Sequence, residues 1–95
     1  MSAHLLIKYP NRIPIIVDGK PDIDRNKYLV PDSLTFGEFI NIIRKRLKLS
    51  SHQALFAFTD NILPPVGMNI RDIYNEYKSE DGFLYIKYRF ENTFG

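Results

Sequence analysis

The chain contains no cysteine and no tryptophan. Without cysteine it can have no disulfide framework, no thiolate nucleophile and no sulfur-ligated metal site. No apolar run approaches the roughly 18 residues that span a bilayer, and residues 1–8 lack the leading positive charge and cleavage site of a secretory signal. The formal net charge is only +2, which is too small to indicate a nucleic-acid partner by itself.

Signals for catalysis are also missing. His4 and His52 have neither a cysteine nor a paired-carboxylate motif nearby, so we expect both on the surface. There is no glycine-rich phosphate loop. Four aspartates fall in predicted turns and caps, where aspartate is common: Asp22, Asp24, Asp32 and Asp60. We therefore predict that the protein is not an enzyme and binds no cofactor or metal.

The remaining composition suits one small domain. The chain has 95 residues, of which 44% are hydrophobic, and seven Phe and six Tyr supply bulk for a single core. We find no repeat and no interdomain linker, so residues 1–95 are predicted to form one domain. Residues 1–10 are expected to be a short N-terminal extension and residues 91–95 a flexible tail.

Local patterns predict the order of the elements. Strands are expected over residues 13–17, 27–30, 55–59 and 83–89, helices over residues 3–9, 36–47 and 69–77, and turns over residues 18–21 and 81–82. Setting the N-terminal helix aside, the order strand, strand, helix, strand, short helix, strand is typical of an α+β β-grasp fold. We expect a four-stranded mixed sheet over one long helix, with a short second helix and an abbreviated N-terminal helix.

The long helix has the clearest local signal. Thr35 and Glu38 form a capping box, and Leu34 and Phe39 fit the hydrophobic staple that often accompanies it. At about 100° per residue, one stripe of apolar side chains is predicted to face the core: Phe36, Ile40, Ile43 and Leu47.

Alternation along the strands predicts apolar surface that lacks a partner. The helix-facing set is expected to be Ile13, Ile15, Val17, Leu84, Ile86 and Tyr88. The far face then collects Pro14, Ile16, Leu29 and Phe83. Only the N-terminal segment, chiefly Leu5 and Leu6, is available to cover these residues, so we expect a partly open pocket.

A second apolar pocket is expected between the strand at residues 27–30 and the long helix. Ile42 lies about 120° from the centre of the core stripe, on the side of Phe39 and Leu34. Three residues would border that side: Tyr28, Val30 and Pro31. If the strand at residues 27–30 is a sheet edge, a peptide could add to it and place side chains three residues apart into the two pockets.

Basic residues gather near the same strand and the end of the long helix: Arg12, Arg25, Lys27, Arg44, Lys45, Arg46 and Lys48. Arg46 lies on the side of Ile42 and could reach acids of a bound peptide. The alternative is a solvated helix C-terminus, where cations suit the helix dipole.

The chain stops at a bare glycine, Gly95, after a strand-like run and a short tail. Because glycine has no Cβ, such an end can pass through a narrow catalytic channel that other residues would block. Its carboxylate could be activated and transferred as an acyl group. This feature predicts a protein that is itself a substrate for conjugation.

Six motifs in order resemble one family closely: Arg12-Ile13-Pro14, Lys27-Tyr28-Leu29-Val30-Pro31, Ile43-Arg44-Lys45-Arg46, Leu63-Pro64-Pro65, Asp81-Gly82-Phe83-Leu84-Tyr85 and Glu91-Asn92-Thr93-Phe94-Gly95. The chain is similar to the autophagy ubiquitin-like modifiers, the lipid-conjugated family that includes the GABA-A-receptor-associated protein. The resemblance covers about Tyr9 to Gly95, with a shortened N-terminus.

The resemblance implies that the fold is ubiquitin-like and that Gly95 becomes attached to phosphatidylethanolamine through E1-like activating and E2-like conjugating enzymes. Before conjugation the protein would be cytoplasmic and monomeric, and it would bind no nucleic acid. After conjugation it would lie on autophagosomal or vesicular membranes. It would recruit receptors that carry an aromatic residue followed three residues later by Leu, Ile or Val.

The same resemblance implies roles for individual residues. The pocket for the aromatic residue would comprise Leu5, Pro14, Ile16, Lys27, Leu29 and Phe83. The pocket for the aliphatic residue would comprise Tyr28, Val30, Pro31, Leu34, Phe39 and Ile42. Arg12 and Arg46 match basic positions that contact the ligand.

Two alternatives stay open from the sequence. An unconjugated ubiquitin-like module would bind peptides without any lipid-linked form. A small basic RNA-binding domain would show an RNA affinity that falls steeply with salt, and charge reversal at Arg44 and Lys45 would abolish it.

Overall fold

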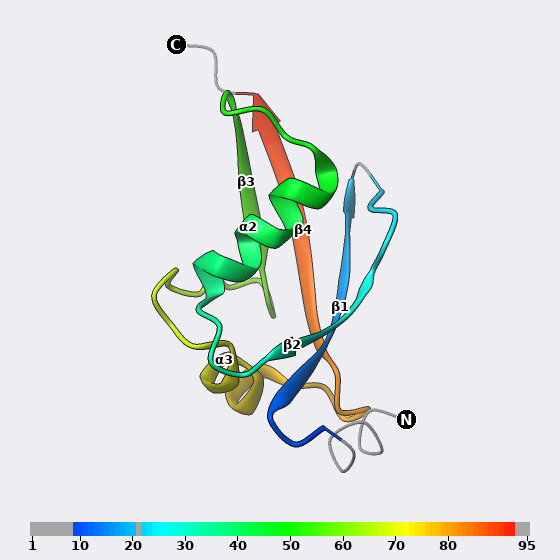
Figure 1. Cartoon of the computed structure of the whole chain (residues 1–95), viewed down its shortest axis with the longest axis vertical. Coiled ribbons are helices and arrows are strands. Elements are labelled where there is room, and N and C mark those ends of the chain that lie inside the picture. The colour runs from blue at the N-terminus through cyan, green and yellow to red at the C-terminus, as the bar shows by residue number, and fades with distance from the viewer. Residues whose placement is uncertain (1–8, 21, 93–95) are drawn as a thin grey trace.

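The computed structural model describes residues 9–20 and 22–92. Within these ranges the elements follow the order β1 (Arg12–Lys20), β2 (Lys27–Pro31), α2 (Phe36–Leu47), β3 (Gln53–Phe58), α3 (Ile70–Tyr77) and β4 (Leu84–Asn92) (Figure 1). The helix predicted over residues 3–9 lies outside the described residues except for Tyr9. Among the described helices, none combines the length and the apolar character needed to cross a bilayer.

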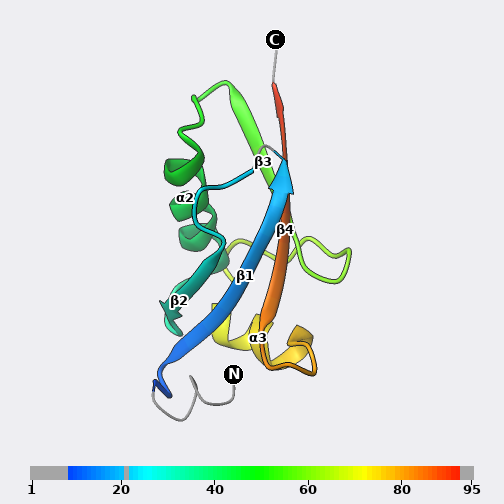
Figure 2. The same ribbon diagram turned by 90° about the vertical axis from the view of Figure 1, so that its right-hand side faces the viewer.

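The four strands form one mixed sheet in the order β2-β1-β4-β3. The central strands β1 and β4 run parallel, whereas β2 and β3 each pair antiparallel with their neighbour. Helix α2 lies on one side of this sheet, as Figure 2 shows. This arrangement confirms the predicted α+β fold with a four-stranded mixed sheet over one long helix.

The core lies between α2 and the sheet, and strand alternation places its residues as predicted. Every member of the expected helix-facing set is buried: Ile13, Ile15, Val17, Leu84, Ile86 and Tyr88. Helix α3 closes one end of this core with Ile70, Ile73 and Tyr74. The hydroxyl of Tyr74 donates to the Gly82 carbonyl oxygen at 2.6 Å, which ties α3 to the turn before β4.

Helix α2 begins where its sequence predicts. The Thr35 side chain accepts from the Glu38 N–H at 3.1 Å, and the Glu38 carboxylate accepts from the Thr35 N–H at 2.9 Å. The predicted core stripe faces the core, since Phe36 and Ile43 are buried and Ile40 and Leu47 pack partly buried against it, but the stripe omitted Phe39, which is fully buried. The fully buried residues of α2 are therefore Phe36, Phe39 and Ile43.

The turn predicted over residues 18–21 is also wrong in its first part. Strand β1 continues through Asp18 and Gly19 to Lys20, because these residues pair in parallel with β4. Gly19 is required there for a steric reason: a Cβ at this position would lie 2.3 Å from the carbonyl oxygen of Tyr88. The glycine therefore permits a close strand contact and not a turn.

Two strand ends differ from the prediction as well. Strand β3 begins at Gln53, and β4 begins at Leu84 and continues through Glu91 to Asn92. The extra residues pair with each other, since Gln53 lies opposite Asn92 and the residue after Gln53 lies opposite Glu91. The first two residues of the expected tail thus belong to the sheet, and residues 93–95 lie outside the described part of the chain.

Candidate peptide-binding edge

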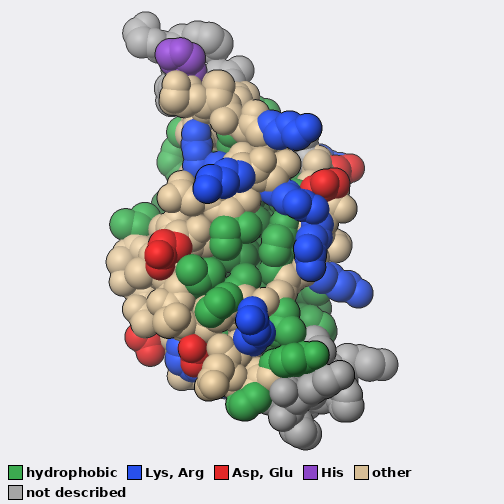
Figure 3. Space-filling model, in the orientation of Figure 1, with side chains coloured by type: hydrophobic (Ala, Val, Ile, Leu, Met, Phe, Trp, Pro, Cys, Tyr) green, Lys and Arg blue, Asp and Glu red, His purple; other side chains and the backbone are tan. Residues whose placement is uncertain are grey.

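Among the described strands, β2 forms one edge of the sheet, because it pairs with β1 alone in the strand order. An edge strand presents backbone N–H and C=O groups that can pair with an added strand. The sequence left open whether this strand lies at an edge, and the topology answers the question. Figure 3 shows hydrophobic side chains gathered in the middle of this view of the molecule, with Lys and Arg side chains along one border.

The hydrogen bonds at the two ends of the β1–β2 pair reveal which backbone groups face outward. The Asp32 N–H donates to the Asn11 carbonyl at 3.0 Å, and the Val17 N–H donates to the Asn26 carbonyl at 2.7 Å. In an antiparallel pair, bonded and non-bonded positions alternate. Odd-numbered residues of β1 therefore occupy bonded positions along this register.

Even-numbered residues of β1 then occupy the non-bonded positions, opposite Pro31, Leu29 and Lys27. Pro14 fits this phase because it has no N–H to donate. At a non-bonded position the backbone groups of the edge strand point away from its neighbour. Lys27 and Leu29 therefore direct both an N–H and a C=O toward the open edge, whereas Pro31 has no N–H and its C=O already accepts from the Leu34 N–H at 3.3 Å.

Residues predicted for the aromatic-binding pocket come together on the face away from α2. Leu29 lies directly opposite Pro14, and Lys27 lies opposite Ile16. Leu29, Ile16 and Phe83 are half-buried and Lys27 is exposed, whereas Pro14 is buried and can only form a floor. We call the described residues Pro14, Ile16, Lys27, Leu29 and Phe83 the outer cluster. Leu5 lies outside the described residues.

Five of the six residues predicted for the aliphatic-binding pocket come together on the helix side of the same edge. Phe39 and Val30 are core residues with exposures of 0% and 6%, so they can form only the floor. Tyr28, Leu34 and Ile42 are partly buried against the core. The inner cluster comprises Tyr28, Val30, Pro31, Leu34, Phe39 and Ile42; Pro31 is exposed at the end of β2, opposite Arg12, and shares the strand phase of Leu29.

Tyr28 is the residue of the inner cluster with an unusual environment. Its hydroxyl is buried and has no hydrogen-bond partner within the described part of the chain. Burial raises the pKa of this hydroxyl above its ordinary value of 10.0, and the nearby Arg46 charge opposes that shift. The Arg25 guanidinium lies over the Tyr28 ring, 5.8 Å from its centroid, within the range of a cation–π contact.

The two predicted ligand-contacting arginines have partners within the protein. Arg12 Nη1 donates to the Leu29 carbonyl oxygen at 3.3 Å. Arg46 Nε donates to Asp24 Oδ1 at 3.1 Å, and both side chains of this ion pair are largely solvent-accessible. Asp24 was assigned only to a turn by its sequence, so this contact between the β1–β2 loop and α2 was missed.

Arg44 was grouped with the basic residues near β2, but the structure gives it another role. Its guanidinium donates to the carbonyls of Gln53 and Ser50 at 2.8 and 2.9 Å. These bonds hold the loop between α2 and β3, where Lys48 adopts a left-handed backbone with φ of 56°. Arg44 is therefore committed to the loop and not to the β2 edge.

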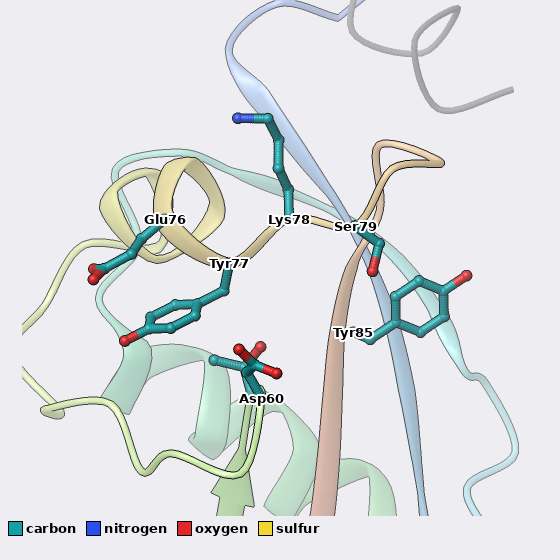
Figure 4. A pocket seen from close by; sticks show the side chains of 7 residues that line it. Asp60, Glu76, Tyr77, Lys78, Ser79 and Tyr85 are labelled. Atoms are coloured by element: carbon teal, nitrogen blue, oxygen red, sulfur yellow. The ribbon is translucent and has the colours of Figure 1, made fainter.

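A hollow that the sequence did not predict lies at the end of α3 (Figure 4). Its volume is about 330 Å³, and it is lined by Thr59, Asp60, Glu76, Tyr77, Lys78, Ser79 and Tyr85. Asp60 and Asn61 both have positive φ, of 54° and 63°. Asp and Asn tolerate this left-handed backbone better than most residues. The Asp60-Asn61 pair is therefore the sequence signal that points to a tight turn beside the hollow.

The fold and the open edge strand are those of a ubiquitin-like protein, and comparison with known sequences agrees. The family model described as "Autophagy protein Atg8 ubiquitin like" matches residues 1–95. The chain is 54% identical to autophagy-related protein 8d of Arabidopsis thaliana, over 99% of this chain and 82% of that protein. It is 57% identical to autophagy-related protein 8 of Schizosaccharomyces pombe, with the same coverage of each chain.

Solved structures lead to the same family. The crystal structure of Trypanosoma brucei ATG8 superposes with a TM-score of 0.86 at 44% identity, covering 99% of this chain and 85% of that one. Plasmodium falciparum Atg8, solved in complex with a Plasmodium falciparum Atg3 peptide, superposes with a TM-score of 0.83 at 32% identity, covering 93% and 83%. The chain belongs to the Atg8 family of ubiquitin-like autophagy proteins, which are modifiers and not enzymes.

Proposed function

We propose that this protein recruits autophagy receptors by adding a short peptide strand to β2. The observation that carries this proposal is the open β2 edge, which lies between the outer and inner clusters. A guest strand would bond to the outward backbone groups of Lys27 and Leu29, and the two clusters would accept its side chains. Main-chain bonds would supply affinity, and the clusters would supply specificity.

The placement of the clusters also accounts for the spacing of the proposed motif. The outer cluster lies on one face of the sheet and the inner cluster on the helix face. Side chains of a strand alternate between faces, so only residues an odd number apart can enter both clusters. An aromatic residue and an aliphatic residue three positions later satisfy this condition and are about 10 Å apart along an extended strand.

We also propose that Gly95 is conjugated to phosphatidylethanolamine. An E1-like enzyme would activate the glycine carboxylate, and an E2-like enzyme would carry it as a thioester to the lipid amine. The solved complex of Plasmodium falciparum Atg8 with an Atg3 peptide supports a partner of this kind. The two acyl chains of the lipid would then hold the protein on autophagosomal membranes, since stable anchoring generally needs two such signals.

Calorimetry with a synthetic aromatic-x-x-aliphatic peptide tests the recruiting function. Leu29→Ala should weaken binding by more than about 1 kcal/mol, because buried anchors dominate such interfaces. Leu63→Ala is the matched control, since Leu63 is 56% exposed on the β3–α3 loop and should leave the affinity unchanged. Equal affinities for the Leu29 variant and the unmodified protein would contradict binding at this edge.

A reconstitution with activating enzyme, conjugating enzyme and phosphatidylethanolamine vesicles tests the conjugation. The unmodified protein should acquire the mass of one lipid, and Gly95→Ala should abolish that product while leaving peptide affinity intact. If the unmodified protein forms no lipid-linked product but still binds the peptide, it acts as an unconjugated interaction module.

A further inference from the structure

Two arginine side chains are bonded to the backbone of β2, and both bonds fall on outward-facing carbonyls. Arg12 Nη1 donates to the Leu29 carbonyl at 3.3 Å, and Arg25 Nε donates to the Lys27 carbonyl at 3.4 Å. The β1–β2 register directs these two carbonyls away from β1, and the third outward carbonyl, that of Pro31, already accepts from the Leu34 N–H. An added strand needs the same two acceptors for its own N–H groups.

Both arginine–carbonyl hydrogen bonds can be replaced by those of an added strand. Their lengths exceed the usual 2.9–3.0 Å of an N–H···O bond, and both arginine side chains are exposed. Their strengths should differ, because the Arg25 guanidinium also lies over the Tyr28 ring. Moving Arg25 away from the edge would therefore cost more than moving Arg12.

We propose that Arg12 and Arg25 are displaceable caps on the β2 edge, which weaken the binding of guest strands that bring no acidic residue. This inference rests on the proposed peptide-binding function. A neutral guest takes over the two carbonyls and sends both guanidinium groups into water. A guest with carboxylates beside its motif gives the displaced arginines new charge-assisted partners, which bond more strongly than a neutral carbonyl does.

Caps of this kind also serve the protein when no guest is bound. An open edge strand invites pairing with other extended chains, and natural proteins often protect such edges with charged side chains. Two cations placed directly on the acceptors of Lys27 and Leu29 discourage pairing with a neutral strand without closing the edge. The same two residues thus protect the edge and select the guest.

Peptide titrations of a double variant provide the first test. Arg12→Met/Arg25→Met removes both donors and retains unbranched side chains, and Lys45→Met/Lys48→Met removes two exposed cations of α2 and its C-cap as a control. The two peptides share one aromatic-x-x-aliphatic core, and one carries two acidic residues before the aromatic residue. The neutral peptide should bind the arginine double variant about threefold more tightly, in line with the net worth of a hydrogen bond.

The acidic peptide should bind the arginine double variant about tenfold more weakly, as expected for lost charge-assisted bonds. The lysine double variant should bind the neutral peptide as the unmodified protein does. A neutral peptide that binds the arginine double variant no more tightly than the unmodified protein would overturn the proposal.

A second readout needs no peptide. In the ligand-free protein, the carbonyl ¹³C resonances of Lys27 and Leu29 should move upfield in the arginine double variant. The Val30 carbonyl, at a bonded position opposite Ile13, should keep its resonance. Unmoved Lys27 and Leu29 resonances would refute the caps. Moved resonances in a protein whose unmodified form binds neither peptide would support the caps and reject the peptide-binding function.

Discussion

The ring of Tyr28 meets the ring of Phe39 edge-on, with centroids 5.7 Å apart and planes at 89°. This contact joins the edge strand β2 to the core face of α2. Edge-to-face packing of this kind adds to the stabilisation from buried area alone. Because both residues belong to the inner cluster, the contact links the position of the proposed site to the packing of the core.

Tyr28 and Tyr74 should respond in opposite ways to loss of the hydroxyl. The Tyr28 hydroxyl is buried without a partner within the described residues, so Tyr28→Phe should raise the free energy of unfolding by about 1 kcal/mol. The Tyr74 hydroxyl donates a hydrogen bond to the Gly82 carbonyl, so Tyr74→Phe should lower the free energy of unfolding by about 1 kcal/mol. Urea denaturation measures both, and a loss of stability in Tyr28→Phe would show that its hydroxyl has a stabilising partner.

The protein should lose stability in alkaline solution above about pH 10. Burial is the main cause that raises the pKa values of Tyr28, Tyr74 and Tyr88 above 10.0. These tyrosines release their protons more readily in the unfolded chain than in the folded protein. Their contribution to the free energy of unfolding is therefore complete below pH 10 and is lost as the pH rises through the folded-state pKa values. Melting temperatures should be level from pH 7 to 9 and then fall.

The double variant Tyr28→Phe/Tyr74→Phe is the control for the alkaline loss. Its melting temperature should fall less steeply above pH 10 than that of the unmodified protein. Parallel curves for the two proteins would mean that these tyrosines do not cause the effect.

Two glycines should differ sharply in their tolerance of a methyl group. Gly19→Ala should lower the free energy of unfolding by about 2–3 kcal/mol, because its Cβ would lie 2.3 Å from a backbone oxygen of the paired strand β4. Gly67→Ala is the matched control, since no atom lies within 4 Å of its added Cβ. Thermal unfolding followed by circular dichroism compares them, and equal melting temperatures would contradict the close strand contact.

Asp24 should compete with acidic guests for Arg46, because the two side chains are already bonded at 3.1 Å. Asp24→Asn should therefore tighten binding of an acidic motif peptide by about two- to fivefold, the range expected for an exposed ion pair. Asp22→Asn is the control on the same loop, as Asp22 pairs with Lys20 instead. Similar gains in both variants would indicate a general charge effect and not release of Arg46.

Local features of the fold were predictable because the interactions that create them are local. The capping box of Thr35 and Glu38 set the start of α2, and strand alternation placed Ile13, Ile15 and their partners in the core. Features that depend on distant pairing were not predictable in this way. Gly19 was assigned to a turn because the β4 residue against which it packs is far along the chain.

In the candidate site, too, features set by local sequence were predictable and features set by contacts between distant segments were not. Alternation was enough to place Leu29 on one face of β2 and Tyr28 and Val30 on the other, because a strand reverses its side chains at every residue. Only the tertiary structure showed that β2 is an edge, that Phe39 is a core residue, and that Arg12 and Arg25 bond to carbonyls of β2. Strand order and long-side-chain contacts depend on how separate segments meet in space, and no local pattern encodes that.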